Sequence, residues 1–126
     1  MKFLDNFQEP AYALLRITSG FMFLWHGTQK FFNFPQDYPY GPLSTLTATA
    51  GAIELVGGIL LILGLLTRPV AFLCSGTMAV AYWLVHGSNS FFPIVNHGEL
   101  AALYCFIFLF IATRGAGIWS LDNRLC

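Results

Sequence analysis

The stretch that decides the fold is Ala48–Leu66, which reads ATAGAIELVGGILLILGLL. Its only charged residue is Glu54, and from Ala52 onward it offers almost no other polar side chain. A helix needs about 20 residues, within a range of about 17–25, to cross the hydrocarbon layer of a bilayer. The stretch therefore predicts a membrane-spanning helix.

Three further apolar stretches accompany it: Ala11–Phe32, Pro69–His86 and Glu99–Thr113. The first two are long enough to span, whereas the last reaches span length only if Asn96–Gly98 or Arg114–Gly117 joins it. We therefore predict an all-α, integral membrane four-helix bundle. It would form a single domain over residues 1–126, with helices at about 11–32, 48–66, 69–86 and 97–114.

The composition argues against the alternative, a water-soluble four-helix bundle. Apolar residues make up 56% of the 126 residues, charged residues only 10%, and the mean hydropathy is +0.65. Soluble domains carry about 25% charged residues, and each of their surface helices needs a polar face, which Phe106–Ala112 lacks. The formal net charge of zero gives no reason to expect a nucleic-acid partner.

Neither the cysteines nor the N-terminus changes this interpretation. Cys74, Cys105 and Cys126 stand alone, without metal-finger spacing, and the first two lie in apolar runs where cysteine is usually a packing residue. Residues 1–10 are polar and amphipathic and lack the build of a cleaved signal peptide. We expect the first apolar stretch to be retained as a membrane helix.

The connections between the stretches are of two kinds. Thr67-Arg68-Pro69 is a tight link, which predicts an antiparallel hairpin of the second and third helices. Phe34–Thr47 and Gly87–Gly98 read as longer loops on the opposite side. We expect the apolar segment Phe91–Val95 either to dip into the membrane interface or to cover the mouth of the bundle.

The distribution of Lys and Arg predicts the orientation. Loops rich in these residues stay in the cytoplasm. One side holds Lys2, Arg68, Arg114 and Arg124, with Arg16 a turn or two inside the membrane, while the other side holds only Lys30. Both termini are expected in the cytoplasm, and the protein in the inner membrane as a multi-pass protein.

Polar residues at membrane depth share helix faces. At 100° per residue, the first helix has one stripe that contains Arg16, Ser19, Gly20, Phe23, His26, Gly27 and Lys30. Glu54 lies on the side of Gly51 and Gly58, and small residues allow a neighbouring backbone to come close. We expect ionisable groups of all the helices to converge at one level near the external face.

Three interpretations of this convergence stay open. One is a structural ion-pair network, with Lys30 bound to Glu54 or Glu99. Another is a binding or redox pocket for a small polar or quinone-like molecule, in which His26 carries protons. The third is a metal site, disfavoured by the absence of H-x-x-x-H or E-x-x-H spacing.

The candidate ligand-binding residues share a position near the external ends of the helices. They are His26, Gln29, Lys30, Glu54, Tyr82, His86 and Glu99. No metal ligands and no catalytic residues are assigned. Arg16 lies toward the other side, where we expect it to pair with the C-terminal helix end or with lipid head groups.

Several segments in order resemble the DoxX family of small bacterial and archaeal membrane proteins. The matching segments are Leu15-Arg16-Ile17, His26–Phe32, Glu54–Gly58, Leu63–Pro69, Asn96–Ala101 and Gly115–Asp122. The resemblance covers essentially the whole chain. One departure is His97, because the family usually has Gly at that position, so a role for the His97 side chain could not be general.

The resemblance implies a four-helix inner-membrane protein related to a subunit of a terminal quinol oxidase. Relatives are associated with thiosulfate-to-quinone electron transfer and, in mycobacteria, with an oxidative-stress complex. The chain has no haem, flavin or iron–sulfur motif of its own, which argues against an autonomous oxidase.

Two function classes remain. One is an oxidoreductase-associated membrane subunit that binds a quinone or a small sulfur compound; the other is a scaffold or assembly protein whose buried charges are purely structural. The sequence identifies no cofactor, and a quinone is a candidate. The expected partners are the lipid bilayer, redox proteins and a second copy of the chain.

Overall fold

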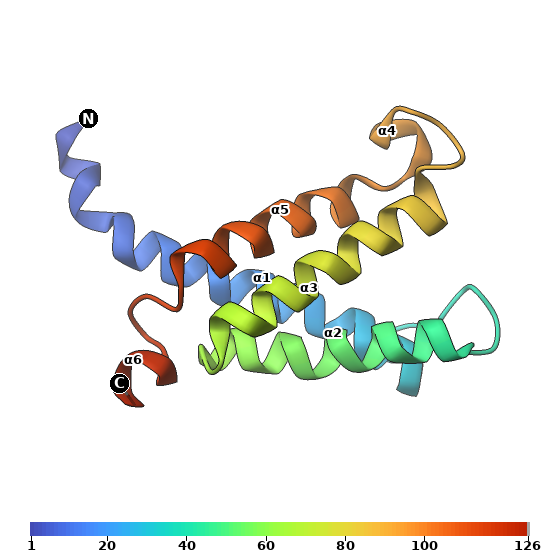
Figure 1. The fold of residues 1–126 in the computed structure, drawn as a ribbon, viewed down its shortest axis with the longest axis horizontal. Coiled ribbons are helices and arrows are strands. Elements are labelled where there is room, and N and C mark those ends of the chain that lie inside the picture. Colours follow the sequence, from blue (N-terminus) through green and yellow to red (C-terminus); the bar gives the residue numbers. More distant parts are fainter. Residues whose placement is uncertain (126) are drawn as a thin grey trace.

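The computed structural model describes residues 1–125 and contains helices but no strands within that range (Figure 1). The all-α prediction is confirmed. The long helices are α1 (Gln8–Phe32), α2 (Thr45–Leu63), α3 (Thr67–Ala81) and α5 (Glu99–Arg114). A π-helical turn, η2 (Tyr82–His86), prolongs α3, and the short elements are η1 (Lys2–Phe7), α4 (Pro93–Asn96) and α6 (Leu121–Leu125).

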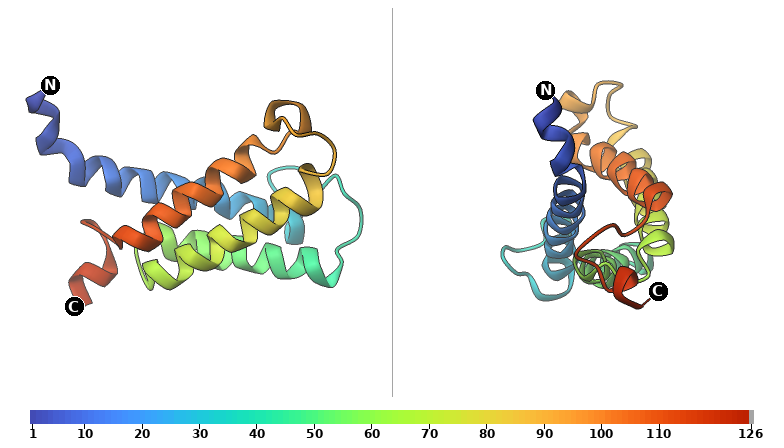
Figure 2. Two further views of the ribbon diagram at one scale, coloured as in Figure 1. Left: turned by 45° about the horizontal axis from the view of Figure 1, so that its top comes forward. Right: turned by 90° about the vertical axis from the view of Figure 1, so that its left-hand side faces the viewer.

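The long helices pack as two pairs. α1 lies against α2, and α3 lies against α5. The α2–α3 turn joins the two pairs, and the backbones of α1 and α5 come close at only a few positions. Both termini and the α2–α3 turn lie at one end of the molecule, and the two longer connections lie at the other (Figures 1 and 2). The N-terminal end of α1 projects beyond the other helices, and residues 1–9 are all exposed.

Several helix boundaries differ from those predicted. α2 begins at Thr45 instead of residue 48, because Ser44 and Thr47 form a reciprocal capping box. It ends at Leu63, and the backbone turns at Gly64 and Leu66, both with positive φ. The predicted link Thr67-Arg68-Pro69 is therefore the first turn of α3.

The other helices differ for similar reasons. α1 begins at Gln8 instead of residue 11, since polar residues continue the helix beyond its apolar run. The regular part of α3 ends at Ala81, where the π-helical turn begins. α5 begins at Glu99 instead of residue 97, because His97 has a left-handed backbone that separates it from α4. Its 16 residues are about 24 Å long at 1.5 Å per residue.

Glycines bring the backbones of α1 and α2 into direct contact. A Cβ atom added at Gly58 would lie 2.8 Å from the Gly20 carbonyl oxygen, and one at Gly27 would lie 2.6 Å from the Leu55 nitrogen. No real side chain fits at such distances. The small residues predicted beside Glu54 are thus the contact surface of the α1–α2 pair.

Aromatic rings fill the space between the two pairs. The rings of Tyr104 and Phe108 on α5 stack in parallel at 5.3 Å, and Phe23 of α1 packs against both. Leu61 and Ile111 are also fully buried there. In contrast, large apolar side chains such as Phe72, Phe106, Val56 and Leu103 are exposed on the outer faces of the helices.

Arg16 closes the end of the molecule that carries the termini. Its side chain is fully buried and donates hydrogen bonds to the carbonyl oxygens of Leu61 (3.0 Å), Ile118 (3.1 Å), Trp119 (2.7 Å) and Ala116. The expectation that Arg16 pairs with the C-terminal segment is confirmed. One guanidinium group thus joins the end of α2 to the segment that follows α5.

Asp122 of the same C-terminal segment caps α3. Its carboxylate accepts hydrogen bonds from the amides of Leu66 (2.9 Å) and Thr67 (2.8 Å), which have no partner within the helix. Burial alone would raise the pKa of Asp122, but these amides and the charge of Arg16 outweigh it and lower the pKa below its ordinary value. The carboxylate is therefore charged at neutral pH and suits the helix N-terminus.

We predict that Gly58→Ala destabilises the protein, because the new methyl group would push α1 away from α2. Overpacking of this kind costs about 1–3 kcal/mol. The control is Gly76→Ala on α3, where an added Cβ meets nothing within 4 Å and where alanine favours the helix by up to about 1 kcal/mol. Thermal unfolding of both variants in detergent measures the difference. Equal melting temperatures would show that the backbones are not in contact.

Candidate functional site

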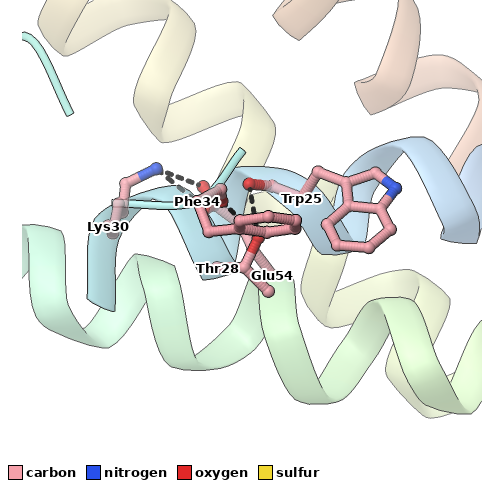
Figure 3. A network of polar contacts seen from close by, with 5 residues as sticks. All are labelled: Trp25, Thr28, Lys30, Phe34 and Glu54. Carbon is pink, nitrogen blue, oxygen red and sulfur yellow. Dashed lines mark hydrogen bonds and ion pairs between the residues drawn. The ribbon is translucent and has the colours of Figure 1, made fainter. Parts of the chain in front are cut away.

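A buried ion pair joins α1 to α2. Lys30 Nζ lies 2.8 Å from one carboxylate oxygen of Glu54 and 3.0 Å from the other, and the Glu54 residue is only 3% exposed (Figure 3). Gly51 makes room for the lysine, since a Cβ there would lie 3.1 Å from Lys30 Cδ. The prediction that Glu54 faces the bundle and contacts a basic group of the first helix is confirmed.

The segment after α1 folds back over the end of that helix. Thr28 Oγ1 donates to the carbonyl oxygen of Phe34 at 2.8 Å (Figure 3). Gln29 Nε2 donates to the carbonyl oxygen of Asp37 at 3.2 Å. The same segment places the ring of Tyr38 with its centre 5.4 Å from Lys30 Nζ. It therefore shields the ion pair with an aromatic face that attracts cations.

An open cleft lies between α1 and this returning segment. Its volume is about 150 Å³, and it is lined by Trp25, His26, Gln29, Pro35 and Gln36. The cleft thus contains two of the predicted ligand-binding residues, His26 and Gln29. Lys30 and Glu54, which bind each other, are absent from its lining.

His26 lies between this cleft and Tyr104, a residue that the sequence analysis missed. The two rings meet edge to face with their centres 6.1 Å apart. Tyr104 is 3% exposed, and its hydroxyl has no hydrogen-bond partner within residues 1–125. Tyr104 could have been predicted from its spacing with Phe108 and Ile111, which places all three on one buried face of α5. A tyrosine on such a face brings a hydroxyl into the core.

The remaining predicted residues lie on the α3–α5 pair, around Asn96. The Asn96 side-chain amide donates to the Tyr82 hydroxyl at 3.1 Å, and the backbone carbonyl oxygen of Asn96 lies 3.0 Å from His86 Nδ1. Glu99 is exposed in the first turn of α5. Asn96 itself is 3% exposed and organises the loop, a role that the sequence analysis did not assign.

The residues that were predicted to converge at one level instead form two separate groups. One group is His26, Gln29, Lys30 and Glu54, and the other is Tyr82, His86 and Glu99. Within the described part of the chain, no hydrogen bond or ion pair joins one group to the other. The reason is the pairing of the helices, which opposes α1 to α2 and α3 to α5. Residues 1–125 also contain no cluster of three His, Cys, Asp or Glu side chains able to hold a metal.

Comparison with known proteins identifies the family. The DoxX family model matches residues 11–87, which is more than half of the chain. The chain belongs to the DoxX family. An uncharacterized protein of Haemophilus influenzae is 45% identical over 98% of this chain and 97% of its own length.

More distant relatives of this DoxX protein carry more informative names. An uncharacterized membrane protein of Mycobacterium tuberculosis is 30% identical over 92% of this chain and 82% of its own length. A Bacillus subtilis protein provisionally named as an oxidoreductase, CatD, is 30% identical over 90% of this chain and 86% of its own length. No solved structure gives a significant match.

The DoxX chain is thus a membrane protein, and the lipid bilayer accounts for its exposed apolar faces. Two of its helical segments, Thr45–Leu63 and Thr67–His86, are long and apolar enough to cross a membrane by length and composition. In this setting the Lys30–Glu54 pair lies in surroundings where an unpaired charge is costly.

The buried pair predicts that two carboxylates, Glu54 and Glu9, contribute very differently to stability. Glu54→Leu leaves Lys30 without its partner, and breaking a buried pair costs about 3–5 kcal/mol. The control is Glu9→Leu, because Glu9 is also paired, with Arg114, but on an exposed surface where such a pair contributes at most about 1 kcal/mol.

Melting temperature and purified yield are the measurements. The double variant Lys30→Met/Glu54→Leu should be more stable than Glu54→Leu, since it removes the stranded charge. If Glu54→Leu and Glu9→Leu melt alike, the pair contributes nothing to stability.

Proposed function

We propose that the protein crosses the inner membrane with its four long helices and keeps both termini in the cytoplasm. The two ends of the molecule differ in their cations, which supports this orientation. Lys2, Arg68, Arg114 and Arg124 belong to the end with the termini, whereas Lys30, at the other end, is neutralised by Glu54. Cationic loops stay in the cytoplasm.

The internal partners of the charges on α1 support its crossing of the membrane. Arg16 is satisfied by backbone carbonyls and Lys30 by a carboxylate, so neither needs water. α5, at about 24 Å, is shorter than the hydrocarbon thickness of about 30 Å. Local thinning of the bilayer and the non-helical segments at its two ends would accommodate the difference.

This topology predicts the behaviour of fused reporters. Alkaline phosphatase, which is active only outside the cytoplasm, should be inactive when fused after Cys126 and active when inserted in the loop after Asn33. A fluorescent protein that folds only in the cytoplasm should give the opposite result at the same positions. Activity at the C-terminus together with inactivity in the loop would reverse the orientation.

We further propose that the protein is the membrane subunit of a redox system and binds the head group of a quinone-like molecule in the cleft beside His26. The observation that carries this proposal is the lining of the cleft, which combines an aromatic face, Trp25, with the polar side chains of His26 and Gln29. Binding sites typically place a few polar groups in apolar walls.

The size of the cleft restricts the ligand. A cavity of about 150 Å³ accommodates a benzene-sized ring, while whole small-molecule sites are about 300–1,000 Å³. A ligand would therefore place one ring in the cleft and leave any tail in the lipid. Trp25 would stack on the ring, and His26 and Gln29 would reach its oxygens.

The chemistry of the side chains suits such a ligand. The amide of Gln29 and a ring nitrogen of His26 can donate hydrogen bonds to a carbonyl oxygen, and a neutral histidine can also accept a proton from a hydroxyl. Electrons would come from a partner protein, because the chain has no redox motif of its own. The provisional oxidoreductase name of the Bacillus subtilis relative is consistent with this role.

Fluorescence of Trp25 tests the proposal directly. In a protein with Trp83→Phe and Trp119→Phe, both at exposed positions, Trp25 is the remaining tryptophan. Short-chain ubiquinone should quench its emission with saturation. His26→Ala and Gln29→Leu should each weaken binding about tenfold, which corresponds to the loss of about 1.4 kcal/mol. Thiosulfate, as competitor, distinguishes a site for sulfur anions.

The matched control is His97→Gly, which removes an exposed histidine at a left-handed position that glycine adopts easily. Its affinity for ubiquinone should equal that of the parent. If neither ubiquinone nor thiosulfate binds the folded parent, or if all variants bind equally, the cleft is not the site.

The second candidate function, a scaffold without a ligand, is favoured by a different observation. Arg16, Lys30, Glu54, Tyr82 and His86 all have partners within the protein. Residues that hold each other need no ligand to explain their presence. This candidate is the conclusion if the fluorescence experiment fails.

A further inference from the structure

The loop between η2 and α5, Gly87–Gly98, is rigidly built around one buried side chain. Besides its bond to Tyr82, the Asn96 amide donates to the carbonyl oxygen of Ser90 at 3.0 Å and accepts from the amide of Gly98 at 2.8 Å. A helical turn follows Phe92, whose carbonyl oxygen accepts from Val95 and Asn96, both at 2.9 Å. Much of the polar backbone of the loop is thus satisfied internally.

The same loop directs its large apolar side chains outward. Phe91 is 86% exposed, Ile94 74%, Phe92 60% and Val95 59%. One alternative from the sequence was that Phe91–Val95 covers the mouth of the bundle. The structure contradicts it, because these side chains make few contacts with the rest of the protein. A loop that is held by internal hydrogen bonds and exposes aromatic and aliphatic side chains indicates a surface that is covered by a membrane or another molecule.

The surroundings of the loop point to lipid. Residues 69–98 contain no Asp, Glu, Lys or Arg, so neither the α3 segment after Arg68 nor the loop itself carries an acidic or a lysine or arginine side chain. The loop directly follows the last turn of the α3 segment, where Trp83, Leu84 and Val85 are exposed. The exposed apolar surface at the end of that helix is therefore followed, after the polar residues 88–90, by the apolar side chains of the loop.

We propose that the loop inserts Phe91, Phe92, Ile94 and Val95 into the lipid bilayer, at the boundary between head groups and acyl chains. Apolar faces of interfacial helices lie about 5–10 Å deep at this boundary, where aromatic residues are enriched. The proposal depends on neither the ligand nor the orientation of the protein.

Tryptophan fluorescence in vesicles tests the insertion. Phe91→Trp and Ile94→Trp are placed singly in a protein whose own tryptophans are replaced by Phe, and each is reconstituted in phosphatidylcholine and phosphatidylglycerol vesicles. The matched control is Ser88→Trp, an exposed polar position of the same loop. Quenchers are iodide in the water and phosphatidylcholine brominated near either end of its acyl chains.

We expect lipid brominated near the glycerol end to remove about half or more of the emission at positions 91 and 94, as a depth of about 5–10 Å requires. Iodide should quench these positions much less than position 88. Quenching by iodide equal to that at position 88, without quenching by lipid, would show that the loop lies in water and overturn the proposal.

Protection from both quenchers would indicate a protein partner or a second copy of the chain and would also overturn the proposal. A measurement that leaves the sequence of the loop unchanged guards against a misfolded variant. Trp83, kept as the single native tryptophan, should be quenched by the same brominated lipid, and lack of quenching there would show that the surface next to the loop lies outside the lipid and would overturn the proposal.

Discussion

Direct contact between the backbones of α1 and α2 determines where the buried charges lie. Cβ atoms added at Gly20 and Gly27 of α1 or at Gly58 of α2 would lie 2.9, 2.6 and 2.8 Å from backbone atoms of the facing helix, closer than a side chain allows. Because the helices are this close, the side chain of Arg16 can reach the carbonyl oxygen of Leu61, and the side chain of Lys30 can reach Glu54. With a larger residue at these positions the helices would separate, and both cations would lose these buried partners, which is costly for a buried charge.

The two ends of α1 then serve different purposes. At the end with the termini, Arg16 and Asp122 attach the C-terminal segment to the α2–α3 turn, so the last residues complete the bundle. At the other end, Lys30 and Glu54 are covered by Tyr38, and the returning segment forms the cleft at His26. The α3–α5 pair uses its own polar residues to hold a loop. It contributes Tyr104 to the space behind His26.

The sequence allowed the helical class and the contacts of single helix faces to be predicted. The stripe of α1 correctly placed Lys30 toward Glu54 and Arg16 toward the C-terminal segment. Periodicity describes one helix at a time, however, and does not say which helices pair. The division of the polar residues into two groups could therefore not be predicted, nor could the ring of Tyr104 beside His26.

Helix ends were missed for a local reason. Leu66 and His97 both adopt left-handed backbone conformations, with φ of 51° and 63°. Such conformations are usually predicted at Gly or Asn; they are uncommon for Leu and, although His adopts them more often than most residues, no feature of the sequence indicated one at His97. The boundary of α3 and the separation of α4 from α5 were accordingly misplaced, and the capping box of Ser44 and Thr47 was overlooked.

The conformation of His97 also explains its departure from the resemblance that the sequence suggested. Glycine, which the resemblance led us to expect here, adopts positive φ easily, and in this chain the histidine adopts it. Its side chain is exposed, while the amide of the next residue, Gly98, is held by Asn96. A Cβ added at Gly98 would lie 2.7 Å from the Tyr82 ring. The loop thus requires a left-handed turn at 97 and a glycine at 98. The imidazole of His97 has no part in this geometry, whereas that of His26 lines the cleft.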